Sequence, residues 1–156
     1  MRIRRASEDD LGELQRAIFT EMSLAELRAA DEQFNRPPGS IQIVAEDNDD
    51  EIIGCCNLIR ETHRMRRHRA ELGGFVIIPA HRGTGLARRM INYLGRYAGR
   101  EWDVSIIDVS CRGGTDAEHA FRGLGFQEWA RLPGGYLDYD AIYDEVRLYR
   151  SVSPLG

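Results

Sequence analysis

One short loop carries residues that could bind a negatively charged group. Residues 82–87 read Arg-Gly-Thr-Gly-Leu-Ala and follow a buried-strand pattern from Leu72 to Ile78. After the loop, apolar residues recur at helical spacing, namely Leu86, Met90 and Leu94. A strand, a glycine-containing loop and a helix N-terminus bring backbone N–H groups together, and the helix dipole adds partial positive charge. We predict an anion site at this loop. A plainer interpretation is that its two glycines only turn the chain.

The loop resembles the acyl-CoA pyrophosphate motif of the GNAT superfamily of N-acetyltransferases. Arg82-x-x-Gly85-x-Ala87, preceded by Ile77-x-Pro79, matches the family pattern Arg/Gln-x-x-Gly-x-Gly/Ala in order and spacing. Segments Arg67–Leu72 and Leu132–Tyr136 are reminiscent of the tabtoxin-resistance type of small-molecule acetyltransferase. The resemblance implies acetyl-CoA as cosubstrate, with its pyrophosphate held by Arg82, Gly83, Thr84, Gly85, Leu86 and Ala87.

The strand before the loop contains the pair Gly73-Gly74. Glycines inside a strand often mark a bulge or a close approach of another backbone. In the family that the chain resembles, this strand bulges and splays from its parallel neighbour, and its free backbone groups bind the pantetheine arm. The resemblance assigns that role to Phe75, Val76 and Ile77, and assigns the oxyanion contact to the Ile77 N–H. A strand with small residues packed under a helix would need no such function.

Glu71 lies at the head of the same strand and is the candidate catalytic base. An alkyl amine with a pKa near ~10 is protonated at neutral pH and cannot attack a thioester until a group accepts its proton. A carboxylate on a partly dry cleft wall can have a raised pKa and accept that proton. The resemblance places a water-assisted general base at this position. The alternative is a structural carboxylate paired with Arg69 or another arginine.

The expected proton donor to the leaving thiolate is absent. The family often carries Asn-x-x-Ala-x-x-x-Tyr-x-x-x-Gly-Phe, whereas this chain has Gly114 for the asparagine and Phe121 for the tyrosine. A thiol has a pKa near ~8.5, so its thiolate leaves tolerably well at neutral pH. Release of the thiolate is therefore expected to proceed without a side-chain acid, or with water, Tyr136, Tyr139 or Cys111 as the proton donor.

These groups require an α/β framework to position them. Strand patterns cover residues 2–6, 40–46, 51–60, 72–78, 104–109, 126–132 and 143–149, helix patterns cover 7–18, 23–34, 82–97 and 115–123, and 133–140 is expected to be a loop. We predict a GNAT-type α/β fold with a mixed, mostly antiparallel twisted sheet flanked by helices. One parallel strand pair would be splayed around acyl-CoA. Residues 1–156 are expected to form a single domain.

The composition and net charge limit the classes of binding partner that are expected. The net charge is 21 − 25 = −4, all basic residues are arginine, and neither the bulk charge nor a long apolar run suggests a nucleic acid or a membrane. Residues 60–69 contain five arginines, which would suit a phosphate-bearing partner, but a solvated turn is the favoured interpretation. Three cysteines without metal spacing suit a reducing, cytoplasmic environment. The acidic run Asp47–Asp50 is expected to be a hairpin tip and not a metal site. The predicted partner is a small-molecule amine acceptor, and a homodimer is compatible with the sequence.

Two other function classes fit parts of the sequence. A dinucleotide-dependent oxidoreductase is suggested by Gly83-x-Gly85 and by Asp108 at the end of the next strand, but Arg88 replaces the third glycine and hairpin strands precede the motif. A module that senses acyl-CoA without turnover would account for the missing tyrosine. A Walker nucleotide site is excluded because the chain has no lysine. The favoured prediction is direct transfer of an acetyl group to a primary amine.

Overall fold

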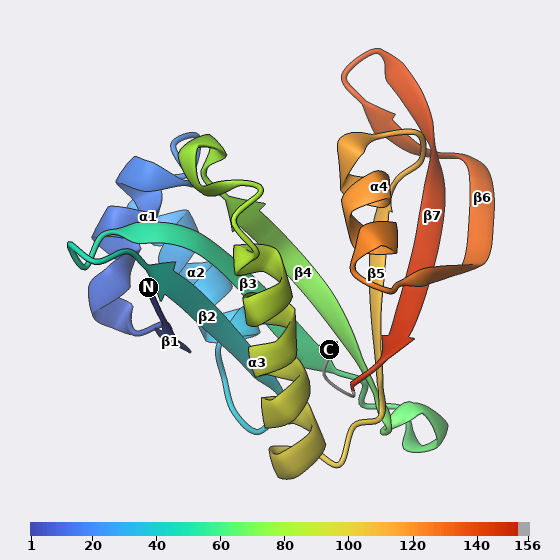
Figure 1. Ribbon diagram of the computed structural model, residues 1–156, viewed down its shortest axis with the longest axis horizontal. Helices are drawn as coiled ribbons and strands as arrows, with labels where there is room; N and C mark the ends of the chain where they lie inside the picture. Colours follow the sequence, from blue (N-terminus) through green and yellow to red (C-terminus); the bar gives the residue numbers. More distant parts are fainter. Residues whose placement is uncertain (153–156) are drawn as a thin grey trace.

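The structure, a computed structural model, describes residues 1–152 and contains one seven-stranded sheet in the order β1-β2-β3-β4-β5-β7-β6 (Figure 1). The strands are β1 (Arg2–Arg5), β2 (Ser40–Glu46), β3 (Ile52–Arg60), β4 (Arg69–Ile77), β5 (Ile106–Arg112), β6 (Gln127–Asp138) and β7 (Ala141–Ser151). The helices are α1 (Leu11–Ala17), α2 (Leu24–Phe34), α3 (Leu86–Glu101) and α4 (Asp116–Gly123). Neighbouring strands are antiparallel except for the parallel pair β4–β5, so the predicted fold class is confirmed.

Helices cover both faces of the sheet. The larger apolar core lies between the sheet and α3 and α4, where Met90, Leu94 and Phe121 are buried. A smaller cluster on the opposite face includes Leu14 of α1 and Val44 of β2. Figure 1 shows α1 and α2 grouped beside the N-terminal half of the sheet, with α3 crossing its other face. One face of β4 therefore lies toward α3 and α4, and its other face lies toward α1 and α2.

The sheet opens between its two central strands. Parallel pairing of β4 with β5 covers only four residue pairs, from Arg69 opposite Ile106 to Leu72 opposite Val109. Beyond these pairs β4 stays with β3 and β5 stays with β7, and Figure 1 shows the two strands diverging. The register of β4 against β3 shifts between the pairs of Gly73 and Val76. Gly74 has a φ of +54° there, which a residue with a Cβ rarely adopts. The predicted bulge and splay are both confirmed.

The boundaries of several elements differ from the sequence-based expectation. Strand β4 begins at Arg69, so Glu71 is its third residue and not its first. The loop expected over residues 133–140 is wrong, because β6 continues to Asp138 and pairs with β7. Glycines weaken a strand pattern, yet here the ladder only shifts between Leu132 and Tyr136 and then resumes. The turn itself is Tyr139-Asp140, with Tyr139 at a φ of +53°.

The strands at the N-terminal edge are tied to the helix that follows. Arg4 donates two hydrogen bonds of 2.8 Å to the Asp10 carboxylate and one of 2.7 Å to Glu46 Oε1. Asp10 ends a short 3₁₀ turn, Glu8–Asp10, that leads into α1. Helix α2 begins with a capping box in which Ser23 and Glu26 exchange side chain–backbone hydrogen bonds. These contacts fix where α1 and α2 cross the sheet.

The acidic segment between β2 and β3 is a hairpin tip, as expected. Asp47 Oδ1 accepts hydrogen bonds from the backbone N–H groups of Asp49 and Glu51 at 2.9 and 3.0 Å. Within residues 1–152, no helix has the length and apolarity needed to cross a bilayer. The expected single domain, 1–156, extends into residues 153–156, which lie outside the described residues.

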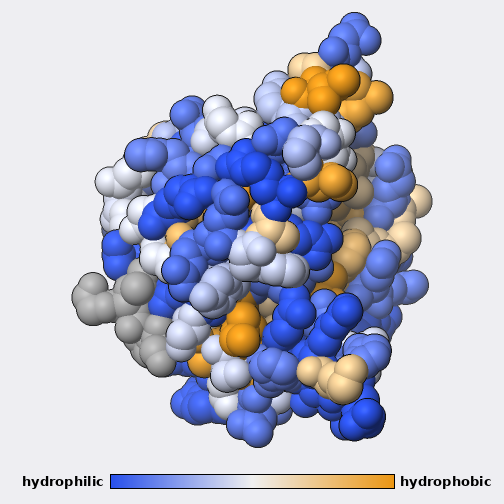
Figure 2. All heavy atoms as spheres, turned by 90° about the vertical axis from the view of Figure 1, so that its right-hand side faces the viewer, coloured by the Kyte–Doolittle hydropathy of each residue, from blue (hydrophilic) through white to orange (hydrophobic). Residues whose placement is uncertain are grey.

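The β6–β7 hairpin carries much of the exposed apolar surface. Leu137 and Ile142 are 72% and 70% exposed, and Tyr139 at the turn is 89% exposed. Figure 2, which looks onto this side of the molecule, shows apolar side chains gathered on its projecting end. The predicted homodimer stays a prediction.

Candidate active site

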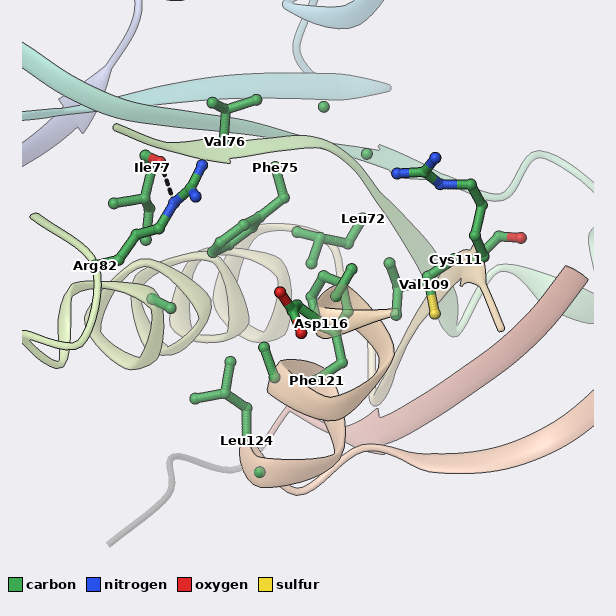
Figure 3. Close-up of a pocket in the computed structure, with 18 of the residues that line it drawn as sticks. Leu72, Phe75, Val76, Ile77, Arg82, Val109, Cys111, Asp116, Phe121 and Leu124 are labelled. Carbon is green, nitrogen blue, oxygen red and sulfur yellow. Dashed lines mark hydrogen bonds between the residues drawn. The ribbon is translucent and has the colours of Figure 1, made fainter. Parts of the chain in front are cut away.

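The divergence of β4 and β5 creates a cleft of about 1220 Å³. Its walls come from the second half of β4, the loop before α3, the end of β5, α4 and the β6 segment around Tyr136. Figure 3 shows Leu72 and Phe75 reaching into this cleft from β4 and Phe121 from α4. Sites for drug-sized ligands usually measure about 300–1,000 Å³. The cleft is therefore large enough for an extended cofactor.

The loop at one end of the cleft has open space where a phosphate group would lie. Gly83 and Gly85 have φ values of +75° and +82°, and a Cβ added to either would meet no atom within 4 Å. Thr84 Oγ1 donates to the His81 carbonyl at 2.7 Å, which closes the loop without occupying that space. The first turn of α3 contains no acidic residue and carries Arg88 and Arg89 instead. Basic side chains at a helix N-terminus oppose the dipole unless an anion binds there.

Backbone groups of Ile77 face the cleft. The Ile78 N–H donates to the Ile53 carbonyl of β3 at 2.9 Å, so alternation along β4 turns the N–H and carbonyl of Ile77 the other way. Arg82 Nε donates to this carbonyl at 3.0 Å (Figure 3). Arg82 is thus folded back along β4 and uses one of the two acceptor positions of the Ile77 carbonyl.

The other two predicted pantetheine residues differ from each other. Phe75 lines the cleft, and its ring packs edge-on against Phe121 with centroids 5.7 Å apart. Val76 also borders the cleft, but its side chain points away from it and packs with the small cluster under α1 (Figure 3). Val76 pairs with Cys55 of β3, and the alternation that turns the Ile77 groups to the cleft turns the N–H and carbonyl of Val76 toward β3. The backbone polar groups of Val76 therefore face β3 and not the cleft.

Phe121 has a packing role where the family's tyrosine is expected. Its ring lies between Phe75 and Phe126, with the second pair of centroids 5.5 Å apart, and only 8% of the residue is exposed. Tyr136 and Ser110 both line the cleft, and their hydroxyl oxygens lie 2.7 Å apart. Burial raises the pKa of the Cys111 thiol, which makes it a weaker acid. Tyr139 does not line the cleft. Of the three side chains considered from sequence, Tyr136 has the best position for proton donation.

Glu71 lies where the cleft meets a second cavity. Within residues 1–152, no arginine forms an ion pair with it, because Arg69 pairs instead with Asp108 at 2.7 Å. Partial burial and the neighbouring negative charge of Asp108 raise the pKa of Glu71, and Arg147 opposes the shift. The structural alternative of a Glu71–Arg69 pair is therefore wrong. An unpaired carboxylate with a raised pKa is suited to accept a proton.

The second cavity, of about 360 Å³, lies beneath α1 and α2. It shares Leu72, Gly73 and Gly74 with the larger cleft, so the two meet at the β4 bulge. Asn57 of β3 borders it, and Asn57 Oδ1 is buried without a hydrogen-bond partner. Sequence reasoning missed Asn57, although a polar residue between the apolar Cys56 and Leu58 was a usable signal. Such an atom is expected to face a ligand or water.

The distance along β4 corrects one sequence-based assignment. Glu71 and Ile77 are six residues apart, which at about 3.3 Å per residue separates them by up to about 20 Å. One water molecule cannot span that distance, so Glu71 and the Ile77 N–H cannot both serve one thioester carbonyl. The bulge at Gly74–Phe75 is closer to Glu71 and adjoins both cavities. Its amides are the better candidates for the oxyanion contact.

Comparison with known proteins agrees with this geometry. The sequence model of the acetyltransferase (GNAT) family matches residues 8–126. The chain belongs to the GNAT family. It is therefore an N-acetyltransferase, and the oxidoreductase alternative is set aside. Among curated protein sequences, none matches this GNAT chain significantly.

Solved structures share the GNAT fold across nearly the whole chain. A chimera of spermidine N-acetyltransferase SpeG from Vibrio cholerae and hSSAT has a TM-score of 0.79 at 23% identity, covering 98% of each chain. Vibrio cholerae SpeG in complex with manganese ions has a TM-score of 0.77 at 23% identity, covering 97% of this chain and 92% of that one. In residues 1–152 of the present chain, no group of three metal-binding side chains comes together.

Proposed function

We propose that this GNAT enzyme transfers an acetyl group from acetyl-CoA to the primary amine of a small molecule by direct attack. The observation that carries the proposal is the meeting of two cavities at the β4 bulge, with the unpaired carboxylate of Glu71 beside it. One cavity has the size and backbone for the cofactor. The other provides a separate entrance for the amine.

The residues along the larger cleft fit the cofactor. The loop from Arg82 to Ala87 would hold the pyrophosphate through backbone N–H groups at the start of α3. Phe75 and Ile77 would bond the pantetheine arm as an added strand, with the backbone groups of Val76 between them turned to β3, since β5 no longer pairs with this part of β4. The bound cosubstrate supplies the activated acetyl thioester. The proton transfers and the contact to the carbonyl oxygen would be made by residues of the protein.

Glu71 would accept the proton of the incoming ammonium group, directly or through one water. The amine nitrogen then forms a bond to the thioester carbonyl carbon, and the C–S bond breaks. Amides at the Gly74–Phe75 bulge would donate to the carbonyl oxygen as its charge develops. As the C–S bond breaks, the nitrogen loses its second proton to water. Tyr136 would donate a proton to the sulfur, assisted by its hydrogen bond with Ser110, and would regain a proton from water.

The test is a turnover assay with acetyl-CoA and a panel of primary amines. Free thiol should be released only when an amine is present, and mass spectrometry should detect the N-acetylated amine in equal amount. Tight binding of acetyl-CoA with no product from any amine would contradict the proposal. That result would favour the second candidate, an acyl-CoA sensor, which is suggested by Phe121 in the usual tyrosine position.

A further inference from the structure

The cavity beneath α1 and α2 has walls that are mostly apolar. The cavity is lined by residues of both helices, of the segment between them and of the sheet. Its apolar lining residues include Leu14, Phe19, Met22, Leu27, Phe34 and Ile59. Leu14 and Leu27 are buried, while Phe19, Met22 and Phe34 are half-buried and border the space. A polar substrate body would lose hydration here and gain few hydrogen bonds.

Polar groups are concentrated at the sheet end of this cavity. Glu71 and Asn57 lie on β4 and β3, beside the bulge where the acetyl group would arrive. Asn57 Oδ1 is buried and has no partner, so it can accept a hydrogen bond from an amine. Glu71 and Asn57 together would orient one ammonium group.

The other acidic residue of the cavity, Asp31, keeps its negative charge. Asp31 of α2 accepts a hydrogen bond from Asn35 Nδ2 at 3.1 Å, and Asn35 in turn bonds the Ala6 carbonyl and Arg5. A polyamine carries several ammonium groups at neutral pH, each with a pKa near ~10. Its first cation could meet Glu71 and a second could meet Asp31, but a third would lie against apolar walls. Burying an unpaired charge is costly.

From this arrangement we propose that the acceptor is a primary amine carried on an apolar body, such as an arylalkylamine, and not a polyamine. The inference rests on the proposed function and names its substrate class. A cavity of about 360 Å³ accommodates a single aromatic ring with a short alkylamine arm. The ring would pack among the α1 and α2 side chains while the amine reaches Glu71.

The first test compares 2-phenylethylamine with spermidine at saturating acetyl-CoA. We expect kcat/KM for 2-phenylethylamine to exceed that for spermidine by at least about tenfold, the effect of burying a phenyl ring. Equal or better use of spermidine would overturn the inference and leave the proposed function standing. Failure to acetylate any amine would overturn both.

The second test changes the cavity wall. Phe34→Ala should raise KM for 2-phenylethylamine about tenfold, with a smaller effect on methylamine, which has no apolar body. Leu24→Ala is the matched control, because Leu24 is on the same helix, is 44% exposed and does not border the cavity. Equal effects of the two variants on KM would overturn the inference.

A third variant keeps the test valid if Phe34→Ala does not fold. Ala30→Glu places a new carboxylate on the cavity wall of α2. It should shift the ratio of kcat/KM values at least about tenfold toward spermidine, with acetyl-CoA affinity unchanged. An unchanged ratio in the folded variant would mean that this wall does not contact the acceptor.

Discussion

At the residue scale, Glu71 is distinguished by having no ion-pair partner within residues 1–152. Arg69 is two positions away on the same strand, yet its guanidinium turns to the buried carboxylate of Asp108 on β5. Arg69 also lies over the Trp129 ring, 5.4 Å from its centroid. This pairing leaves the negative charge of Glu71 uncompensated by an ion pair and keeps Asp108 in place as a like charge beside it. Both effects favour a carboxyl group that can exchange a proton.

The first prediction concerns the stability cost of this arrangement. The pKa of Glu71 is raised in the folded chain, so the folded state binds the proton more tightly and stability decreases as pH rises through that range. At pH 7, Glu71→Gln should therefore keep or slightly raise Tm. Asp108→Asn should lower Tm, because it leaves the Arg69 guanidinium without its partner. Thermal denaturation followed by circular dichroism measures both. A clear drop in Tm for Glu71→Gln would indicate a structural role.

The second prediction concerns the pyrophosphate loop. Gly85→Glu fills the open space above the α3 N-terminus and adds a charge of the same sign as the phosphates. Calorimetry should show acetyl-CoA affinity at least tenfold lower, about 1.4 kcal/mol. Gly114→Glu is the matched control, because Gly114 has a φ of +76° and equally open surroundings outside the cleft. Equal affinities for the two variants would remove the loop from the binding site.

The third prediction concerns proton return to the thiolate. Tyr136→Phe should lower kcat by about tenfold, below the usual range for general acids because a thiolate leaves readily. Acetyl-CoA affinity should stay unchanged. Tyr139→Phe is the control at the exposed hairpin turn and should have no effect. If kcat of Tyr136→Phe equals that of the wild type, water donates this proton.

At the element scale, the bulge of β4 and its parting from β5 create the site. A Cβ added at Gly73 would lie 2.8 Å from Asn57 Oδ1, so a side chain at this position would push the Asn57 amide aside. The glycine pair therefore brings β4 close to the unpartnered amide of β3. It also turns the strand where its pairing with β5 ends. The same two residues position the larger cleft, the cavity beneath α1 and α2 and their junction.

The fourth prediction concerns the attachment of the acceptor layer. Arg4→Met removes the hydrogen bonds to Asp10 and one to Glu46, both of which are buried, and should cost about 2–3 kcal/mol at pH 7. Arg4 lowers the pKa of both carboxyl groups below their ordinary values of 3.8 and 4.5. The stabilisation is therefore complete above that range and is lost as pH falls through the lowered values.

Urea denaturation at pH 7 and in the acid range measures this difference. The gap between wild type and Arg4→Met should narrow with acid. Arg28→Met is the control, since the Arg28 side chain is 60% exposed, faces the exposed Glu8 at 3.7 Å and should contribute little. A gap that stays constant with pH would mean that the network does not act through these carboxyl groups.

At the scale of the whole molecule, local patterns predicted the framework well. The order of strands and helices, the glycine bulge and the loop before α3 follow from periodicity and glycine placement, which act over short stretches of chain. The β6 extension past Gly134-Gly135 was missed, because its pairing with β7 depends on a distant partner. The preference of Arg69 for Asp108 depends on the β4–β5 register in the same way. The mostly apolar cavity beneath α1 and α2 combines residues from six separate segments, which no local pattern reveals.

The central claim is that acetyl transfer occurs at the junction of the two cavities, with Glu71 taking the proton. The most direct test is the pH dependence of kcat/KM from pH 6 to 9 for wild type and Glu71→Gln with one competent amine. The variant lacks the proton acceptor, so it reacts only with amine that is already deprotonated in solution. The fraction of free amine rises about tenfold per pH unit below the amine pKa. Glu61→Gln, which changes a nearby carboxylate outside both cavities, is the control.

We expect kcat/KM of Glu71→Gln to be about 100-fold below wild type at pH 7, within the usual range for a general base. The deficit should shrink steadily toward pH 9, and the Glu61→Gln profile should follow that of the wild type. Profiles of wild type and Glu71→Gln that run parallel within a factor of about three across this range would contradict the claim.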